Sequence, residues 1–278
     1  MPQFAEPIRI ISDLHLGHPG GWLTDARQVG GVIEGAATVI FNGDIVESRW
    51  GEERMHAARH LDAMRALCEK CGAVPVFING NHDPAISDIN HIDLAGGAVF
   101  ATHGDVLFAG VSPWSQLGPL LTAAHEEALA KLNGDELESL EHLLHASKEA
   151  SARLELFAPF ANRVKPGTLA LLRRAGWPPW RPLRILRVWA ETPSLAAKFA
   201  VRHRPRARLI LIGHTHRPGI WLRGPRAVIN TGGFMALGSP LAVDLADGTL
   251  TIRRIRRRKN EFVIGPVISR HEATPLSA

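Results

Sequence analysis

The sequence LILIGHTH, at residues 209–216, joins a buried strand to a pair of candidate metal ligands. The short apolar run predicts the strand. Side chains two positions apart on an extended segment point to the same side, so His214 and His216 can reach one spot beyond its end. Gly213 allows the tight turn that this arrangement needs. A single His-x-His pair is weak support for a metal site, so its meaning depends on the other strands.

Four other polar clusters each follow an apolar run of their own. They are Asp13-Leu14-His15 after residues 8–11, Asn42-Gly43-Asp44 after 38–41, Asn79-Gly80-Asn81-His82-Asp83 after 74–78, and His103-Gly104-Asp105 after 98–101. Strands that alternate with helical patterns predict a mostly parallel sheet with right-handed crossovers. Ligands of such sheets bind beyond the carboxyl ends of the strands. We therefore expect all five clusters to meet at one edge.

The clusters offer seven candidate metal ligands, which are Asp13, His15, Asp44, Asn81, His103, His214 and His216. Seven ligands are too many for one tetrahedral site and suit two metals that share Asp44. Imidazole and carboxylate together favour Mn, Fe or Zn over Ca or Mg, and we expect two divalent ions, with Mn first. Two metals about 3.5–4 Å apart can hold a hydroxide between them and clamp a phosphoryl group for in-line attack.

In this order the five motifs resemble those of the calcineurin-like metallophosphoesterase superfamily, over about residues 8–105 and 208–255. The resemblance implies an α/β (α+β) fold, a two-layered β-sandwich flanked by helices. It implies hydrolysis of phosphomonoesters, diesters or pyrophosphates. It assigns one metal to Asp13, His15, Asp44 and His216, and the other to Asp44, Asn81, His103 and His214.

The resemblance also gives roles to residues that hold no metal. His82 corresponds to a histidine that stabilises the transition state or protonates the leaving group. Asp83 is then expected to orient His82. For Asp105 two interpretations stay open: it orients His103, or it caps the next turn.

Within the superfamily, ISDLHLG at residues 11–17 and His103-Gly104-Asp105 are most similar to the UDP-2,3-diacylglucosamine pyrophosphatases of lipid A synthesis. The best-known branch of these enzymes has arginine where this chain has His82, and a related branch keeps histidine. The similarity implies a phosphorylated, lipid-linked substrate. The alternatives are a soluble phosphodiesterase or phosphatase acting on nucleotides or nucleic acid, and a non-catalytic scaffold, which the complete ligand set disfavours.

Residues 112–205 break the alternation and are expected to form a helical insertion within a single domain, 1–278. Residues 119–162 predict two helices, separated near Asn133. Residues 163–208 carry ten Arg and two Lys against one acid, with Trp177, Trp180 and Trp189 among them. This composition is compatible with an anionic membrane surface, with nucleic acid, or with an ordinary solvated face. Substrate binding is expected from Arg181, Arg184 and Arg187.

Composition sets further limits. The net charge of +5 and pI of about 9.8 favour anionic partners. No apolar run approaches the roughly 18 residues of a membrane span, and the first residues lack the apolar core of a signal peptide, so we expect a cytoplasmic protein. The basic composition and the implied lipid-linked substrate lead us to expect it at the inner face of the membrane, as a peripheral protein. Cys68 and Cys71 lie in a predicted helix and are interpreted as idle thiols. The basic run at 253–259 either reinforces an anionic contact or protects a strand edge.

Residues 241–245 and 249–255 predict a closing hairpin around Asp247-Gly248. The chain after about Arg258 is expected to be partly disordered.

Overall fold

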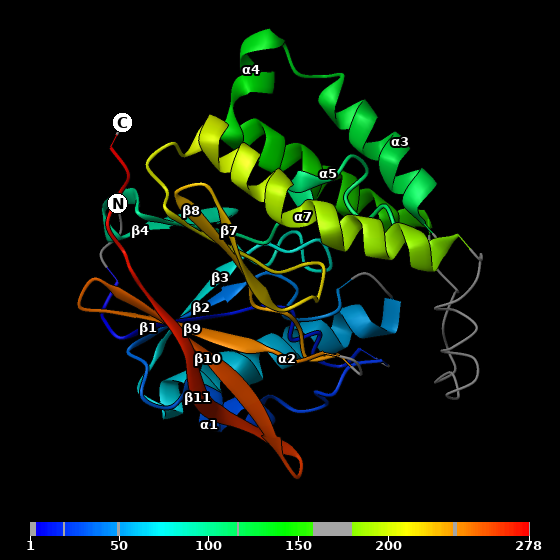
Figure 1. Cartoon of the computed structure of the whole chain (residues 1–278). Helices are drawn as coiled ribbons and strands as arrows, with labels where there is room; N and C mark the ends of the chain where they lie inside the picture. The colour runs from blue at the N-terminus through cyan, green and yellow to red at the C-terminus, as the bar shows by residue number, and fades with distance from the viewer. Residues whose placement is uncertain are drawn as a thin grey trace.

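A computed structural model describes residues 4–18, 20–48, 51–115, 117–157, 180–235 and 238–277, without side chains at 51–54 and 154–157. Two β-sheets lie face to face, and helices cover their outer faces (Figure 1). The first sheet has the order β11 (Glu261–Glu272), β10 (Thr249–Arg258), β9 (Leu241–Ala246), β1 (Ile8–Ile11), β2 (Thr38–Asn42), β3 (Val74–Ile78). The second has the order β4 (His91–Leu94), β5 (Val99–Thr102), β6 (Leu209–Ile212), β8 (Arg226–Asn230), β7 (Gly219–Arg223). The expected two-layered sandwich is confirmed.

The first sheet is parallel from β1 to β3 and antiparallel from β9 to β11, whereas the second is parallel at its centre and antiparallel at both margins. Strands β1, β2 and β3 run parallel, as do β5, β6 and β8. The carboxyl ends of β1, β2 and β3 therefore lie at one edge of their sheet, and those of β5, β6 and β8 lie together in the other.

The central strands are apolar on both faces because successive side chains point to opposite sides of the sheet and both sides are buried. In β1, Ile10 packs into the core between the sheets, whereas Ile11 faces the helices. In β6, Leu211 faces the other sheet and Ile212 faces the helices. Full burial of each such side chain contributes about 1.5–3 kcal/mol.

Each sheet has its own helical cover. On the first lie η1 (Ala26–Val29), α1 (Gly30–Ile33) and α2 (Gly51–Lys70), whose Val32, Ile33 and Met64 join one core cluster. On the second lie α5 (Leu140–Phe157) and α7 (Arg181–His203), with α3 (Gly118–Leu129) and α4 (Gly134–Glu138) beside α5 (Figure 1). Short 3-10 turns are η2 (Ala95–Gly97) and η3 (Asp105–Leu107). No described helix is long and apolar enough to cross a bilayer.

Among the described residues, 112–205 contain the helices α3, α4, α5 and α7, a division that differs from the one predicted. Asn133 caps a short extra helix, α4, instead of ending a turn between two long helices, because its side chain accepts from Glu136 N–H and Glu136 returns the bond. Residues 158–179, including Trp177, lie outside the described residues.

The expected closing hairpin is present, but the expectation of disorder after Arg258 is wrong. Residues 261–272 form β11, which pairs with β10 along its length. The sequence did not reveal this strand because few of its residues are buried and the apolar–polar alternation is weak. Phe262 is the exception, at 1 % exposure, and the apolar residues that it contacts are distant in the chain.

Candidate metal centre

The ends of four strands bring the candidate ligands together. Asp13 and His15 follow β1, Asp44 follows β2, His103 follows β5, and His214 and His216 follow β6. Five of these six residues have positive φ, between 46° and 67°, and only His103 is not among them. This conformation is uncommon outside glycine and costs on the order of 1–3 kcal/mol per residue. Such strain persists where the surrounding structure holds it, and its concentration here marks a functional site.

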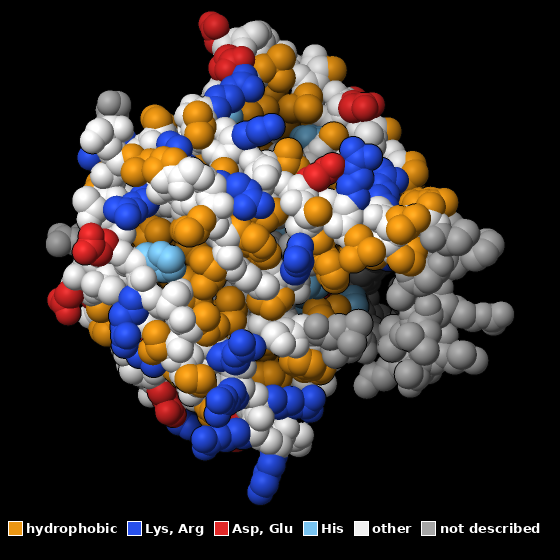
Figure 2. Space-filling model, in the orientation of Figure 1, with side chains coloured by type: hydrophobic (Ala, Val, Ile, Leu, Met, Phe, Trp, Pro, Cys, Tyr) orange, Lys and Arg blue, Asp and Glu red, His pale blue; other side chains and the backbone are white. Residues whose placement is uncertain are grey.

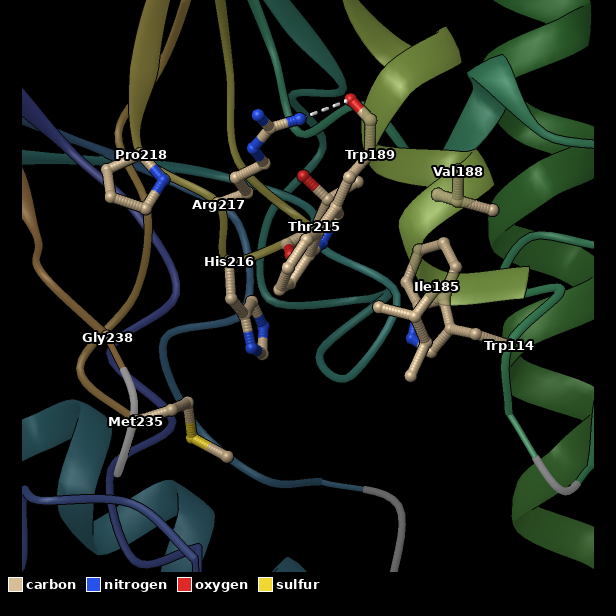
Figure 3. A pocket seen from close by; sticks show the side chains of 10 residues that line it. All are labelled: Trp114, Ile185, Val188, Trp189, Thr215, His216, Arg217, Pro218, Met235 and Gly238. Carbon is tan, nitrogen blue, oxygen red and sulfur yellow. Dashed lines mark hydrogen bonds between the residues drawn. The ribbon is translucent and has the colours of Figure 1, made fainter. Parts of the chain in front are cut away.

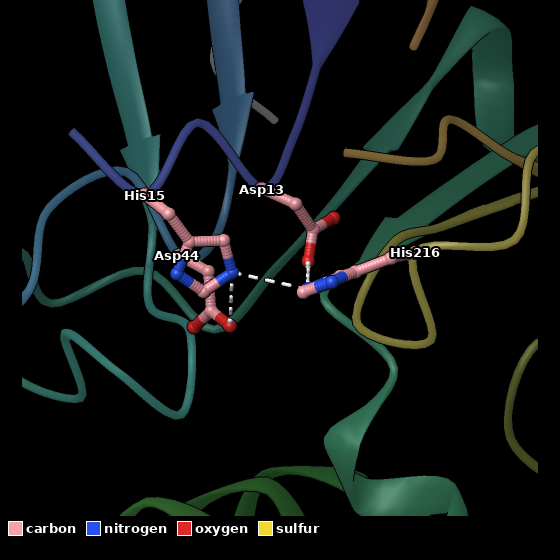
Figure 4. Close-up of side chains that lie close together, drawn as sticks. All are labelled: Asp13, His15, Asp44 and His216. Carbon is pink, nitrogen blue, oxygen red and sulfur yellow. Dashed lines mark hydrogen bonds and ion pairs between the residues drawn. The ribbon is translucent and has the colours of Figure 1, made fainter. Parts of the chain in front are cut away.

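A first group consists of Asp13, His15, Asp44 and His216 (Figure 4). The Nε2 atoms of His15 and His216 lie 3.0 Å apart. His216 Nε2 lies 3.2 Å from Asp13 Oδ1, and His15 Nε2 lies 3.6 Å from Asp44 Oδ2.

A second group consists of Asp44, His103 and His214, so Asp44 belongs to both. His103 Nε2 lies 3.3 Å from Asp44 Oδ2 and 3.0 Å from Asn81 Oδ1. The other Asp44 oxygen, Oδ1, accepts the backbone N–H of His82 at 2.8 Å, which fixes the direction of Oδ2.

The donor set and its spacing fit two divalent cations. Ligand atoms about 2.1 Å from a shared ion are separated from one another by roughly 3.0–3.5 Å in octahedral or tetrahedral geometry. The distances above span 3.0 to 3.6 Å. The two imidazole nitrogens that face each other at 3.0 Å are also close enough to share one cation.

Burial and charge set the protonation of these groups. Burial lowers the pKa of His15 below its ordinary value, and it lowers the pKa of His214 to about 3. Both imidazoles are therefore neutral, as metal binding requires. Burial also acts on His103, but the Asp44 carboxylate outweighs it and raises the pKa of His103 to about 9. Burial by itself would raise the pKa of Asp44, but the neighbouring His103 and His82 hold it well below its ordinary value.

Backbone carbonyls orient two of the histidines. His103 Nδ1 lies 3.0 Å from Asn42 O, and His214 Nε2 lies 2.9 Å from Val111 O. The remaining nitrogen of each ring is thereby left for the metal groups. Asp13 is held by the backbone N–H of His214, at 2.9 and 3.1 Å from its two oxygens.

His82 lies at the rim of the two groups. Its Nε2 is 4.0 Å from Asp44 Oδ2, and its side chain is 22 % exposed. Its Nδ1 lies 2.7 Å from Glu47 Oε2, and Glu47 is buried. The ring is therefore held by Glu47, with the opposite nitrogen near the bridging carboxylate.

Asp83 does not orient His82, contrary to our expectation. Its oxygens instead accept the backbone N–H groups of Gly80, Asp44, Ile45 and Val46 at 2.6–3.2 Å. Four donors turn the carboxylate toward the loop after β2, so Asp83 fixes the backbone that presents Asp44. Burial and the nearby Asp44 charge raise the pKa of Asp83 to about 6.

Glu47 is the residue that the sequence analysis missed. The sequence signal was its position three residues after Asp44; the burial of residues 44–47 is seen only in the structure. A buried carboxylate needs a partner, but the sequence does not show which one it finds.

Asp105 does not orient His103, which was the first of its two interpretations, because its carboxylate is hydrogen-bonded elsewhere. Ser147 Oγ and Lys148 Nζ each donate to its carboxylate at 2.6 Å, and both come from α5. Burial opposes its charge, but Lys148 outweighs this and holds the pKa of Asp105 well below its ordinary value. This fully buried pair fastens the helical cover to the loop that carries His103.

An apolar pocket of about 420 Å³ opens beside His216 (Figure 3). Its walls are Trp114, Ile185, Val188, Trp189, Thr215, His216, Arg217, Pro218, Met235 and Gly238. Figure 3 shows the His216 ring and Met235 on one side of the hollow and Ile185 with Trp114 on the other. Trp189 is fixed by its Nε1 bond to Thr215 O at 3.0 Å, and Arg217 Nη1 donates to Trp189 O at 2.9 Å.

The three arginines predicted to bind substrate do not line this pocket. Arg181 is partly buried and donates to the backbone oxygen of Trp114, a residue of the pocket wall, at 2.9 Å. Arg184 lies over the Trp180 ring, and Arg187 pairs with Glu191 at 2.8 Å on the exposed face of α7. The helical period separates Arg187 from the pocket face at 185, 188 and 189, whereas Arg181, one turn before Ile185, is held away by its bond to Trp114 O.

Comparison with known proteins identifies the family. The family model for calcineurin-like phosphoesterases matches residues 6–218. No curated protein shows significant similarity. The fold is similar to a dimetal phosphatase from Danio rerio (13 % identity, TM-score 0.45, covering 93 % of this chain and 99 % of that one). It is also similar to Vps29 from Entamoeba histolytica (12 %, 0.44, 95 % and 98 %) and to a cold-active protein-tyrosine phosphatase of a Shewanella species (14 %, 0.41, 95 % and 82 %).

These similarities to solved structures are too remote to bear on activity. The family match covers well over half of the chain and includes all of the candidate ligands. The chain therefore belongs to the calcineurin-like phosphoesterase family.

Proposed function

We propose that this protein is a dinuclear metal-dependent hydrolase of an amphipathic phosphoester or pyrophosphate, of the UDP-2,3-diacylglucosamine type. The supporting observation is the apolar pocket that shares His216 with the first group of candidate ligands. A substrate whose phosphorus lies at the ligand groups would have room for an apolar substituent in that pocket. The proposal places the enzyme in the cytoplasm, against the inner face of the membrane.

Seven residues are proposed as ligands: Asp13, His15, Asp44 and His216 for one cation, with Asn81, His103 and His214 joining Asp44 for the other. Bound there, two divalent cations, Mn²⁺ first among the candidates, would polarise the phosphoryl oxygens and lower the pKa of a water molecule for attack. Asp83 keeps Asp44 in place through the loop backbone. Glu47 directs His82, whose Nε2 is proposed to serve the leaving oxygen as a proton donor.

The pocket walls also bear on the rival function. Trp114 and Trp189 give it two indole faces, and an indole can cover a nucleobase as well as an acyl chain. A soluble nucleotide phosphodiesterase is therefore the second candidate.

The experiment compares two variants of α7 on three substrates. Ile185→Ser changes the pocket wall, and Leu183→Ser changes a side chain of the same helix that is 69 % exposed. The substrates are UDP-2,3-diacylglucosamine, the same nucleotide sugar without acyl chains, and bis(p-nitrophenyl) phosphate. With Ile185→Ser we expect KM for the acylated substrate to rise about tenfold, since full burial of isoleucine contributes roughly 1.5–3 kcal/mol.

Leu183→Ser and both non-acylated substrates serve as controls and should change little. An equal rise in KM for all three substrates would show that Ile185 shapes the site and does not read an acyl chain. Faster turnover of a cyclic nucleotide than of the acylated substrate by the unaltered enzyme would favour the soluble phosphodiesterase.

A further inference from the structure

The hairpin formed by β10 and β11 carries a dense positive charge that the metal centre does not use. Between Asp247 and Glu272 there are six Arg and one Lys, against the single acid Glu261. Arg254, Arg256, Arg258 and Lys259 are exposed, and we call these four residues the basic tip. Figure 2 shows the Lys and Arg side chains gathered at the bottom of the molecule, over this hairpin.

Strand directions place the basic tip at the edge that carries the candidate ligands. Strand β9 is antiparallel to both β1 and β10, so β10 runs in the direction of β1. The carboxyl end of β10 therefore lies at the same edge of the sheet as Asp13 and His15. The last pair with β9 is Arg254 with Leu241, so residues 255–258 extend past β9 and pair only with β11.

The hairpin is firmly anchored, with its charge directed outward. Phe262 is buried, stacks on Trp22 with ring centroids 5.9 Å apart, and meets the Phe234 ring edge at 5.1 Å. Arg257 lies over the Trp22 ring at 5.7 Å. Phe234 precedes Met235, which lines the apolar pocket. The basic tip is thus connected by packed rings to the pocket wall.

Protection of a sheet edge does not fully explain this charge. Arg254 lies where β10 has a neighbour on each side, and Arg256 and Arg258 lie beyond the end of β9, where one side of β10 is open. Nor does ion pairing explain it: among the described residues Arg253 pairs with Asp244, but Arg254, Arg256 and Arg258 form no ion pair. Uncompensated, immobilised charge at an exposed tip is suited to an external anion.

The start of α7 indicates which kind of anion. Its pocket-facing residues adjoin His216, and on its outer side Trp180, Leu183 and Leu186 are 52 %, 69 % and 56 % exposed. Large exposed apolar side chains and tryptophan suit the boundary of a bilayer and offer little to a phosphodiester backbone. Acids are also scarce here, because none occurs from Trp180 to Ala190.

We infer that the basic tip binds the headgroups of an anionic phospholipid bilayer and holds the metal-bearing edge toward the membrane. The inference rests on the proposed function at one point: if the substrate is lipid-linked, membrane binding brings it to the metal centre. Each basic residue near an anionic surface contributes roughly fivefold to partitioning, so loss of three should cost on the order of 100-fold.

The test is co-sedimentation of the full chain with vesicles of phosphatidylcholine alone and with 30 % phosphatidylglycerol. The unaltered protein should sediment only with the anionic vesicles, and 0.5 M NaCl should release it. The triple variant Arg254→Gln, Arg256→Gln, Arg258→Gln should lose on the order of 100-fold in partitioning. The matched control is the triple variant Arg202→Gln, Arg206→Gln, Arg208→Gln. These three exposed arginines precede the first residue of β6, at the end of the strand away from His214, and this variant should sediment like the unaltered protein.

Several outcomes would overturn the inference. It fails if the unaltered protein ignores anionic vesicles, if both triple variants lose sedimentation equally, or if the basic-tip variant keeps it. It also fails if the basic tip is needed for binding a single-stranded oligonucleotide but not vesicles. Hydrolysis of bis(p-nitrophenyl) phosphate, measured in parallel, should be the same for all three proteins. An inactive but vesicle-binding protein would refute the proposed function and leave this inference standing.

Discussion

Replacement of Glu47 by Gln should impair catalysis without removing metal. The Glu47 carboxylate is 2 % exposed, and its Oε2 lies 2.7 Å from Nδ1 of His82. Glutamine keeps the size of the side chain but removes the charge that holds the His82 ring. Loss of such an orienting group typically costs 10–100-fold, so kcat should fall by about that factor, equivalent to roughly 1.4–2.7 kcal/mol.

The assay uses leaving groups of different quality. Phenyl phosphate needs a proton on its leaving oxygen, whereas p-nitrophenyl phosphate departs with little help. Glu47→Gln should therefore reduce kcat strongly with the first and weakly with the second, and His82→Ala should show the same pattern with a loss of roughly 10²–10⁴ on the first. In the His82→Ala background, Glu47→Gln should add almost nothing, because both changes act on one group.

Controls separate this role from a structural or ligand role. Glu69→Gln, on the exposed face of α2, should change neither rate nor metal content. Glu47 also lies close enough to His15 and His82 to join a metal site. Loss of bound metal in Glu47→Gln, measured by elemental analysis, would refute the orienting role, as would equal losses of kcat on both leaving groups.

Three further outcomes are expected. Asp44→Ala should remove most of both metals and the activity, and a single retained ion with full activity would contradict a bridging role. Lys148→Met leaves the Asp105 charge buried and should lower the free energy of unfolding in urea by about 3–5 kcal/mol, whereas Lys131→Met, in a pair with 50 % and 30 % exposed side chains, should cost under about 1 kcal/mol. Burial, with Cys71 nearby, raises the pKa of the Cys68 thiol to about 12 from 9.0, so Cys68 should resist a thiol reagent at pH 8 until unfolding. The folded state then holds this proton more tightly than the unfolded state, so stability should fall as pH rises above about 9.

The metal groups could be predicted from sequence because each part is local. A run of apolar residues makes a strand, and the polar residues that follow it must lie at the strand's end. Asp13, Asp44, His103 and His214 each have this placement. Parallel pairing brings the ends together within each sheet, and the packing of the two sheets then brings His216 beside His15 and His103 beside Asp44.

Other features depend on how side chains turn once the chain is folded. Asp83 is adjacent to His82 in sequence, yet four backbone N–H groups turn it away, and the more distant Glu47 takes its place. The basic residues of α7 were expected at the substrate, but the helix directs Arg184 and Arg187 outward and presents Ile185 to the pocket.

The sequence by itself determined the strands, the order of their polar ends and the set of candidate ligands, and the family resemblance of its motifs implied the two-layered sandwich. Only the tertiary structure decided the partner of His82, the ion pair of Asp105 with Lys148, the ordered β11 strand and the pocket beside His216. The physical reason is that periodicity and turn chemistry act over a few neighbouring residues. Partners, burial and pocket walls arise from contacts between segments tens to hundreds of residues apart, whose geometry is set by the packing of the whole chain.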